Sequence, residues 1–276
     1  MIKISIVTAT FNRIKKLKSL YQNLKNQKNK FFFELEWVVI VEQNDFKTIH
    51  FLKSISEFKV KIVINKHYKK FSSLIKQGID NTAGDYISVV GDDDFFFKNS
   101  LEIVVKKILS NNKPKILVGY ADYKDRNNIK IRSNIGKIKK LFLNTNSRLL
   151  LGFVNYYMCP AVFFKKDLTK KINCFPINYS NINDYITWLQ IRNLYKPIII
   201  KQNIANVGFE KGTISYSFNI EKYIFMWKIY LKSKNYFYLL PLKIIFSIML
   251  LIYNYTYRAL GLLLSSFNPR LSRGDR

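Results

Sequence analysis

The sequence is poor in the residues that build zinc sites, disulfide frameworks and glycine-rich phosphate loops. It contains 2 cysteines, 2 histidines and 10 glycines in 276 residues. Cys159 and Cys174 have no metal-ligand spacing, and so few cysteines indicate a reducing compartment. His50 and His67 stand alone, which argues against a histidine-based zinc site. The segment "TATFNRIKK" after the first apolar run has no glycine, which argues against a nucleotidyltransferase with a glycine-rich phosphate loop.

Acidic residues are also scarce, with 18 Asp and Glu against 46 Lys and Arg, and the formal net charge is +28. This charge is typical of partners such as nucleic acid, an anionic membrane surface or a phosphate-bearing ligand. A composition bias toward Lys, Asn, Ile, Phe and Tyr accounts for part of it. The aromatic residues fall in apolar runs and no recognised nucleic-acid-binding motif is present, so nucleic acid is not the expected partner. A basic nucleic-acid-binding protein stays open as an alternative.

Apolar, β-branched runs alternate with lysine-rich segments of helical spacing over the first 125 residues. Short runs of this kind fit strands that are buried on both faces. The predicted strands are Ile2–Thr10, Leu35–Val41, Val60–Ile64, Tyr86–Val90 and Lys115–Tyr120. The alternation predicts βαβ units and a doubly wound α/β fold with a mostly parallel central sheet. The segment Asp125–Asn155 departs from the pattern and is predicted to be a polar excursion such as a hairpin.

Three of the few acids are adjacent in the stretch "VVGDDDFFF", Val89–Phe97. In a doubly wound sheet, ligands bind beyond the carboxyl ends of the strands, and Asp92, Asp93 and Asp94 follow such an end. Adjacent carboxylates are costly unless a cation compensates them, and Mg²⁺ and Mn²⁺ prefer oxygen ligands. We therefore expect a divalent cation here. The alternative is a solvated acidic turn that caps a helix beginning near Ser100.

The last third of the chain changes in character. Asn181–Tyr195 is predicted to be a helix with an Asn-rich start. Residues 216–276 are predicted to be a helical region whose apolar, aromatic and lysine residues associate with a membrane surface, although packing on the core or on a partner is the alternative. The uncharged stretch Ile244–Tyr257 is short for a membrane-spanning helix. The N-terminal segment lacks the features of a secretory signal.

Four segments, in order, resemble glycosyltransferase family 2, whose members are inverting enzymes with the GT-A fold. "ISIVTATFNR" resembles the first strand and nucleotide-binding loop, and "EWVVIVEQND" resembles the second strand with its following acid. "FSSLIKQGIDNTAGDYISVVGDDD" resembles the segment that leads to the DxD motif, and "NDYITWLQI" resembles the helix start that carries the catalytic base. The resemblance implies a catalytic domain at 1–215, with a nucleotide-sugar half at about 1–125 and an acceptor half at about 126–215.

The resemblance also implies roles for single residues. The nucleotide-sugar would contact Thr8, Thr10, Arg13, Glu42, Lys76, Asp92 and Asp93, and the metal would contact Asp92, Asp93 and Asp94. Gly91 stands where the family usually has its first acid. Asp184 matches the catalytic base, with Asn183 in place of the usual acidic neighbour, and its alternative role is that of an acid at a helix N-terminus. Lys211, in "GFEKGTIS", replaces a histidine near the phosphates.

The resemblance further implies a metal-dependent glycosyltransferase that moves a hexosyl or N-acetylhexosaminyl group. The donor would be a nucleoside-diphosphate sugar, with a UDP-sugar favoured, and the acceptor a glycan or lipid-linked glycan. Mg²⁺ or Mn²⁺ would be the cofactor. The basic, apolar C-terminal region suggests assembly of a bacterial surface polysaccharide or lipooligosaccharide at the cytoplasmic face of the cell membrane. A sugar-nucleotide-binding protein without catalysis stays open as an alternative.

Overall fold

The structure is a computed structural model that describes residues 1–27, 33–65, 71–124, 133–178 and 182–208. The chain divides into two units, Met1–Phe218 and Asn219–Arg276, and the fold below is that of the first. The predicted helical region 216–276 and Lys211 lie outside the described residues. Among the described residues, no helix is both long enough and apolar enough to cross a membrane.

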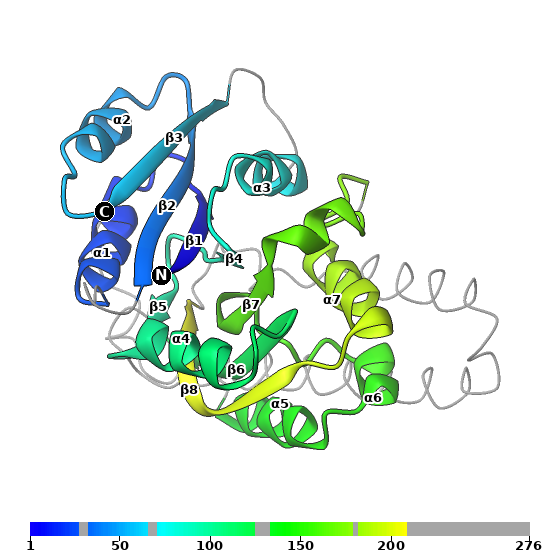
Figure 1. The fold of residues 1–276 in the computed structure, drawn as a ribbon. Helices are drawn as coiled ribbons and strands as arrows, with labels where there is room; N and C mark the ends of the chain where they lie inside the picture. Colours follow the sequence, from blue (N-terminus) through cyan, green and yellow to red (C-terminus); the bar gives the residue numbers. More distant parts are fainter. Residues whose placement is uncertain (28–32, 66–70, 125–132, 179–181, 209–276) are drawn as a thin grey trace, which may run out of the picture. The chain divides into compact units, whose positions relative to one another are not determined.

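Strands and helices alternate through the first half of the chain, as the sequence pattern predicts (Figure 1). The strands are β1 (Ile2–Ala9), β2 (Phe33–Glu42), β3 (Lys59–Asn65), β4 (Tyr86–Val89), β5 (Phe95–Phe96), β6 (Ile116–Lys124), β7 (Val162–Lys165) and β8 (Ile198–Gly208). The helices are α1 (Ile14–Lys25), α2 (Phe46–Lys53), α3 (Phe71–Asp80), α4 (Ser100–Ser110), α5 (Ser133–Thr145), α6 (Arg148–Phe153) and α7 (Asn183–Leu194), with short 3₁₀ turns η1 (Cys159–Ala161) and η2 (Lys166–Lys170).

The described strands form one sheet in the order β3-β2-β1-β4-β7-β6-β8-β5. β1 to β4 are parallel where they pair, which confirms the predicted α/β class. The second half of the sheet is mixed, because β7 is antiparallel to both β4 and β6, whereas β8 is parallel to β6. β6 and β8 therefore run in the direction of β4, and all three end at the same edge of the sheet.

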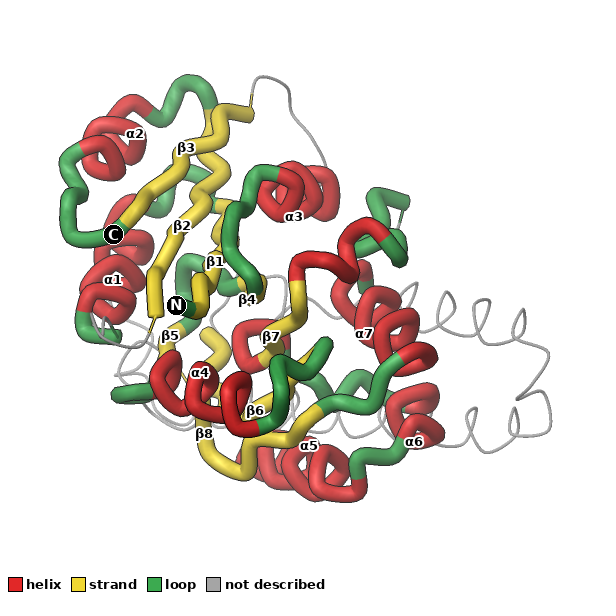
Figure 2. The backbone as a smooth tube through the Cα atoms, viewed as in Figure 1, coloured by secondary structure: helices red, strands yellow, loops and turns green. Residues whose placement is uncertain are grey.

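Helices cover both faces of the sheet (Figure 2). On one face, α1 and α4 contribute apolar side chains to a core shared with the strands, which includes Leu17, Leu20, Ile4, Trp37 and Val104, and α4 packs against β8. On the other face, α3 packs so closely on the sheet that a Cβ atom at Gly78 would lie 2.5 Å from Ile40 and 2.6 Å from Val7. Continuous apolar strands are expected when both faces are covered in this way.

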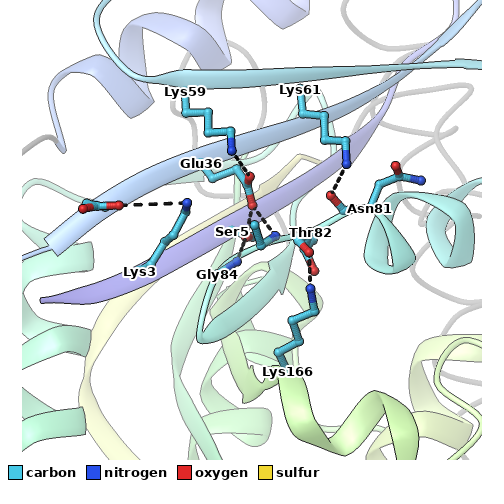
Figure 3. A network of polar contacts seen from close by, with 11 residues as sticks. Lys3, Ser5, Glu36, Lys59, Lys61, Asn81, Thr82, Gly84 and Lys166 are labelled. Atoms are coloured by element: carbon cyan, nitrogen blue, oxygen red, sulfur yellow. Dashed lines mark hydrogen bonds and ion pairs between the residues drawn. The ribbon is translucent and has the colours of Figure 1, made fainter.

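A buried carboxylate ties the loop before β4 to the first half of β1 and β2 (Figure 3). Glu36 is fully buried and accepts hydrogen bonds from the Ser5 hydroxyl (2.5 Å) and the Ala83 N–H (2.6 Å). The Ser5 hydroxyl accepts in turn from the Gly84 N–H, and Lys59 Nζ lies 3.6 Å from Glu36 Oε1. Burial would raise the pKa of Glu36, but these hydrogen bonds and two nearby lysines outweigh it and lower the pKa. The network fixes the start of β4.

Candidate functional site at the carboxyl ends of β1 and β4

The three adjacent aspartates form a turn at the end of β4. The Val90 N–H donates to the Val7 carbonyl (2.9 Å), which keeps the chain beside β1 until the turn begins. The Asp94 N–H then donates to the Gly91 carbonyl (3.2 Å) and closes the turn. β5 follows directly and pairs with β8. The acidic stretch therefore lies at the carboxyl end of β4, as predicted, and this is the edge where α/β sheets bind ligands.

Asp92 joins this turn to the loop between β1 and α1. Its Oδ2 accepts a hydrogen bond from the Thr10 hydroxyl (2.8 Å), and its Oδ1 lies 3.3 Å from Arg13 Nη1. Asp92 is 4% exposed, and burial raises its pKa although Thr10 and Arg13 act in the opposite direction. Both carboxylate oxygens of Asp92 are therefore held by side chains that the sequence places in the nucleotide-binding loop.

Asp94 joins the turn to the end of β8. Its carboxylate accepts hydrogen bonds from the Gly91 N–H (2.7 Å) and the Gly208 N–H (3.0 Å). A Cβ atom at Gly208 would lie 2.3 Å from the Asp93 carbonyl oxygen, so glycine allows β8 to approach this closely. Burial, followed by the charge of Asp93, raises the pKa of Asp94 to about 8. Backbone N–H groups hold this carboxylate without a neighbouring cation strong enough to keep its pKa low.

Asp93 is paired differently from its two neighbours. Its Oδ2 lies 3.6 Å from Lys16 Nζ and, among the described residues, has no hydrogen-bond donor. Its Oδ1 and Asp94 Oδ2 both lie close to Gly91, because a Cβ atom at that position would be 2.9 Å and 3.1 Å from them. A side chain at position 91 would crowd both carboxylates. The turn thus combines two carboxylate oxygens beside Gly91 with one buried oxygen that lacks a hydrogen bond.

This geometry fits a divalent cation held mainly by Asp93 and Asp94. Within the described part of the chain, no three His, Cys, Asp or Glu side chains form a ready-made metal site. Mg²⁺, however, commonly uses one or two carboxylates and completes its shell with water and substrate phosphates. Asp93 and Asp94 supply two such groups, whereas Asp92 is already bound to Thr10 and Arg13.

Asp184, the predicted base, lies in the first turn of α7. Its Oδ1 accepts a hydrogen bond from the Tyr185 N–H (2.7 Å), and its Oδ2 accepts one from Asn155 Nδ2 (3.4 Å). The Asp184 N–H donates to Asn183 Oδ1 (2.8 Å), so Asn183 helps to close the start of the helix. A helix N-terminus stabilises an ionised carboxylate, the form that a general base requires.

Cys159 connects the neighbourhood of Asp184 with that of the acidic turn. Burial raises the pKa of the Cys159 thiol, and the charges of Asp184 and Asp94 raise it further. The charges of both carboxylates therefore act on one thiol, although the two residues are far apart in the sequence.

The other predicted donor-site residues have separate surroundings. Thr8 is fully buried, and its hydroxyl accepts a hydrogen bond from the Trp37 indole N–H (3.1 Å). Glu42 ends β2 and accepts a hydrogen bond from Asn65 Nδ2 (2.6 Å) at the end of β3. Lys76, in α3, lies 3.8 Å from Asp80 on the same helix. Of the predicted residues outside the turn, Thr10 and Arg13 contact Asp92, and the roles of the others stay predictions.

The sequence reading did not single out several neighbours of the site. Lys16 contacts Asp93 and Asn155 contacts Asp184, and both contacts join segments that are far apart in the sequence. The Gly208 N–H was missed for the same reason, since a backbone donor leaves no signature in composition. One signal was present: Lys16 follows Arg13 by three residues and thus lies on the same side of α1.

Comparisons with known proteins agree on one family and one fold. The sequence model described as "Glycosyl transferase family 2" matches residues 5–173. The crystal structure of S. aureus TarS 1-349 is similar with a TM-score of 0.58 and 16% identity over 75% of this chain and 60% of that chain. The complex of TarS 1-349 with UDP-GlcNAc has a TM-score of 0.58 and 15% identity over 83% of this chain and 65% of that chain. The complex with UDP has a TM-score of 0.59 and 16% identity over 75% of this chain and 61% of that chain.

The chain spans less than two thirds of these TarS structures, and at such identities the likeness concerns the fold. A search of curated protein sequences gives no match.

Proposed function

We propose, from the premise that the chain belongs to glycosyl transferase family 2, that it transfers a sugar from a nucleoside diphosphate to a hydroxyl of a glycan acceptor, with a divalent cation and with inversion. The observation that carries the proposal is the acidic turn Gly91–Asp94. It is bound to the start of α1 through Asp92 and to the end of β8 through Asp94, at the edge where α/β sheets bind nucleotides. Membership of the family makes the chain a glycosyltransferase, and the proposal concerns how it works and on what.

The donor site would lie along the ends of β1, β2 and β4. Thr10 and Arg13 begin the loop that holds Asp92, and the Arg13 side chain is 40% exposed, so its guanidinium can also contact a diphosphate. Glu42, at the end of β2, would read the base, and Lys76 would lie near the donor sugar. A complex of TarS with UDP-GlcNAc has the same fold, which makes UDP-GlcNAc the first donor to test.

Asp93 and Asp94, whose carboxylates both lie close to Gly91, would hold the divalent cation. A cation bound there would neutralise negative charge on the departing nucleoside diphosphate. The protein contributes the fixed geometry. Asp94 is held by two backbone N–H groups, and the turn is anchored on both sides.

Asp184 would act as the general base that accepts the proton of the acceptor hydroxyl. Asn155 and the Tyr185 N–H hold its two oxygens, so the carboxylate has a fixed orientation before the acceptor binds. Attack on the face opposite the leaving group then inverts the anomeric centre in one displacement. This route needs no covalent nucleophile.

A panel of nucleotide-sugars tests this proposal. Purified protein with Mn²⁺ should release free nucleoside diphosphate from one donor, with a UDP-sugar expected. Asp184→Asn should lower turnover by about 100-fold or more, the range for loss of a general base, while it leaves donor binding in place. Asp167→Asn is the matched control and should keep full turnover, because the Asp167 side chain is 41% exposed and pairs with Lys115 at the start of β6, away from the strand ends that form the site. Undiminished turnover in Asp184→Asn would contradict the base assignment. Donor binding without turnover by any donor and acceptor would favour the catalytically inactive alternative.

A lipid-linked glycan at the cytoplasmic face of a membrane is the acceptor that we propose, as part of surface polysaccharide or lipooligosaccharide assembly. The net charge of +28 and the apolar, lysine-containing region 216–276 support association with an anionic surface. Flotation of the full chain with vesicles tests this association. Binding should require anionic lipid and weaken with salt. Equal binding to neutral vesicles at high salt would contradict the electrostatic part of the proposal.

A further inference from the structure

Lys16 lies beside the aspartate that the proposed cation would use. Its Nζ is 3.6 Å from Asp93 Oδ2, and both side chains are mostly buried, with 14% and 15% of their surface exposed. Among the described residues, no donor forms a hydrogen bond with this oxygen. The ammonium group thus balances the charge of Asp93 without fixing it by a hydrogen bond.

The position of Lys16 on α1 does not stabilise the helix itself. Arg13 precedes the helix, Lys15 and Lys16 lie in its first turn, and this turn contains no acidic residue. Cations at a helix N-terminus oppose the helix dipole. The neighbouring carboxylates of Asp92 and Asp93 offset this unfavourable placement, because each has a cation of the α1 start within ion-pair distance.

The two cations differ in what they leave available. Arg13 and Thr10 occupy both oxygens of Asp92, whereas Lys16 contacts one oxygen of Asp93. The other oxygen of Asp93 lies close to Gly91, as does Oδ2 of Asp94. A divalent cation bound by Asp93 would share this carboxylate with the ammonium of Lys16, and two cations on one carboxylate repel each other.

We infer that Lys16 is an internal counter-ion of the acidic turn and competes with the divalent cation for Asp93. In the cation-free protein it keeps adjacent carboxylates together. When a divalent cation binds, the ammonium of Lys16 repels it, and the affinity for the cation is lower than the carboxylates alone would give. This inference rests on the proposed function, since it takes the proposed cation to bind at Asp93 and Asp94.

Binding of Mn²⁺ alone to the full chain tests the competition, with free Mn²⁺ measured by its electron paramagnetic resonance signal and no donor present. Lys16→Met should tighten Mn²⁺ binding about fivefold or more, or about 1 kcal/mol. Lys15→Met is the matched control, because Lys15 is an exposed lysine in the same helical turn and its loss changes the net charge equally. It should alter Mn²⁺ affinity by less than about twofold, since exposed charges are screened.

The outcomes separate this inference from the metal site itself. If Asp93→Asn binds Mn²⁺ as well as the wild type, the cation does not use Asp93, and both the proposed site and the competition are wrong. If Asp93→Asn loses Mn²⁺ but Lys16→Met binds no tighter than Lys15→Met, the site stands and the competition is overturned.

Thermal unfolding gives a second measure of the affinity for Mn²⁺, since a ligand that binds the folded state raises the melting temperature. Lys16→Met leaves Asp93 without its cation, so Mn²⁺ should raise its melting temperature more than it raises that of the wild type. Lys16→Arg keeps the charge, and tighter Mn²⁺ binding by this variant would overturn the inference. A Lys16→Met protein that stays unfolded even with Mn²⁺ would show that Lys16 is needed for folding and would overturn it as well.

Discussion

Two buried carboxylates in the same sheet are stabilised in different ways. Glu36 lies in the first half of β2, where a hydroxyl and an N–H donate to it and Lys59 approaches (Figure 3). Asp94 lies beyond the end of β4, where it accepts hydrogen bonds from two backbone N–H groups and has acidic neighbours. The pKa of Glu36 is lowered, whereas that of Asp94 is raised to about 8.

The difference separates a structural carboxylate from a functional one. Two hydrogen bonds to Glu36 Oε2 and two nearby lysines keep its pKa low, although Oε1 has no hydrogen bond among the described residues, so Glu36 holds the loop before β4 in place as an ionised group. Asp94 has donors that fix its position but not enough positive charge to balance it and Asp93 together. In the proposed function, a divalent cation completes this site, since buried charge without compensation is costly.

The largest expected effect is on activity, which substitution of Asp94 should lower and substitution of Glu36 should not. Asp94→Ala removes a carboxylate from the proposed cation site, and sugar transfer should fall by about 100-fold or more, as when a preorganised charge stabiliser is lost. Glu36→Gln should keep the turnover of each folded molecule. Initial rates of nucleoside diphosphate release, corrected for folded protein, measure both. Similar rate losses in the two variants would contradict the distinction between a functional Asp94 and a structural Glu36.

The next expected effect is on stability, where substitution of Glu36 should be costly although it leaves turnover unchanged. Glu36→Gln places an amide where the Ser5 hydroxyl and the Ala83 N–H both donate, and the free energy of unfolding should fall by about 1–3 kcal/mol. Urea denaturation measures this change. Glu34→Gln is the control, because Glu34 lies on the same strand with a side chain 59% exposed and a distant ion pair with Lys3 (3.9 Å). The two substitutions should not destabilise equally.

The pH dependence of stability sharpens the contrast further. Asp94 ionises near 3.8 when unfolded and near 8 when folded, so between these values the folded protein holds a proton that the unfolded chain releases. Its contribution to stability is therefore fully present below about pH 4 and is lost as the pH rises toward 8. As the pH rises through this window in cation-free protein, the free energy of unfolding of Asp94→Asn should increase relative to that of the wild type, by up to about 1.4 kcal/mol per pH unit. Urea denaturation in EDTA at several pH values measures the difference, and a constant difference would contradict the raised pKa.

The sequence predicted the parallel half of the fold well, because both faces of those strands are covered and the apolar runs are continuous. Tyr86–Val90 matches β4 to within one residue, and Ile2–Thr10 matches β1 equally well. It did not predict α5 and α6, which lie in the segment read as a polar excursion. Ile138 and Leu141 of α5 are 47% and 62% exposed, so this helix does not bury a simple apolar stripe that a periodicity could reveal.

The candidate site was predicted to the extent that it is local in sequence. Strand ends place Thr10, Arg13 and the aspartates at one edge, and the structure joins them through Asp92. The contacts of Asp93 with Lys16 and of Asp94 with the Gly208 N–H depend on how α1 and β8 meet the turn. Sequence spacing carries no information on such contacts, so it could not say which aspartate is free to bind a metal.

The acidic turn is proposed to bind a nucleoside diphosphate through a divalent cation. The most direct measurement is the melting temperature of the protein with UDP, with Mn²⁺ and with both, in the wild type, in Asp93→Asn and in Glu36→Gln. A ligand that binds the folded state raises the melting temperature. UDP and Mn²⁺ together should raise it more than the sum of the two alone, in the wild type and in Glu36→Gln but not in Asp93→Asn. A joint effect that persists in Asp93→Asn, or its absence from the wild type, would contradict the account.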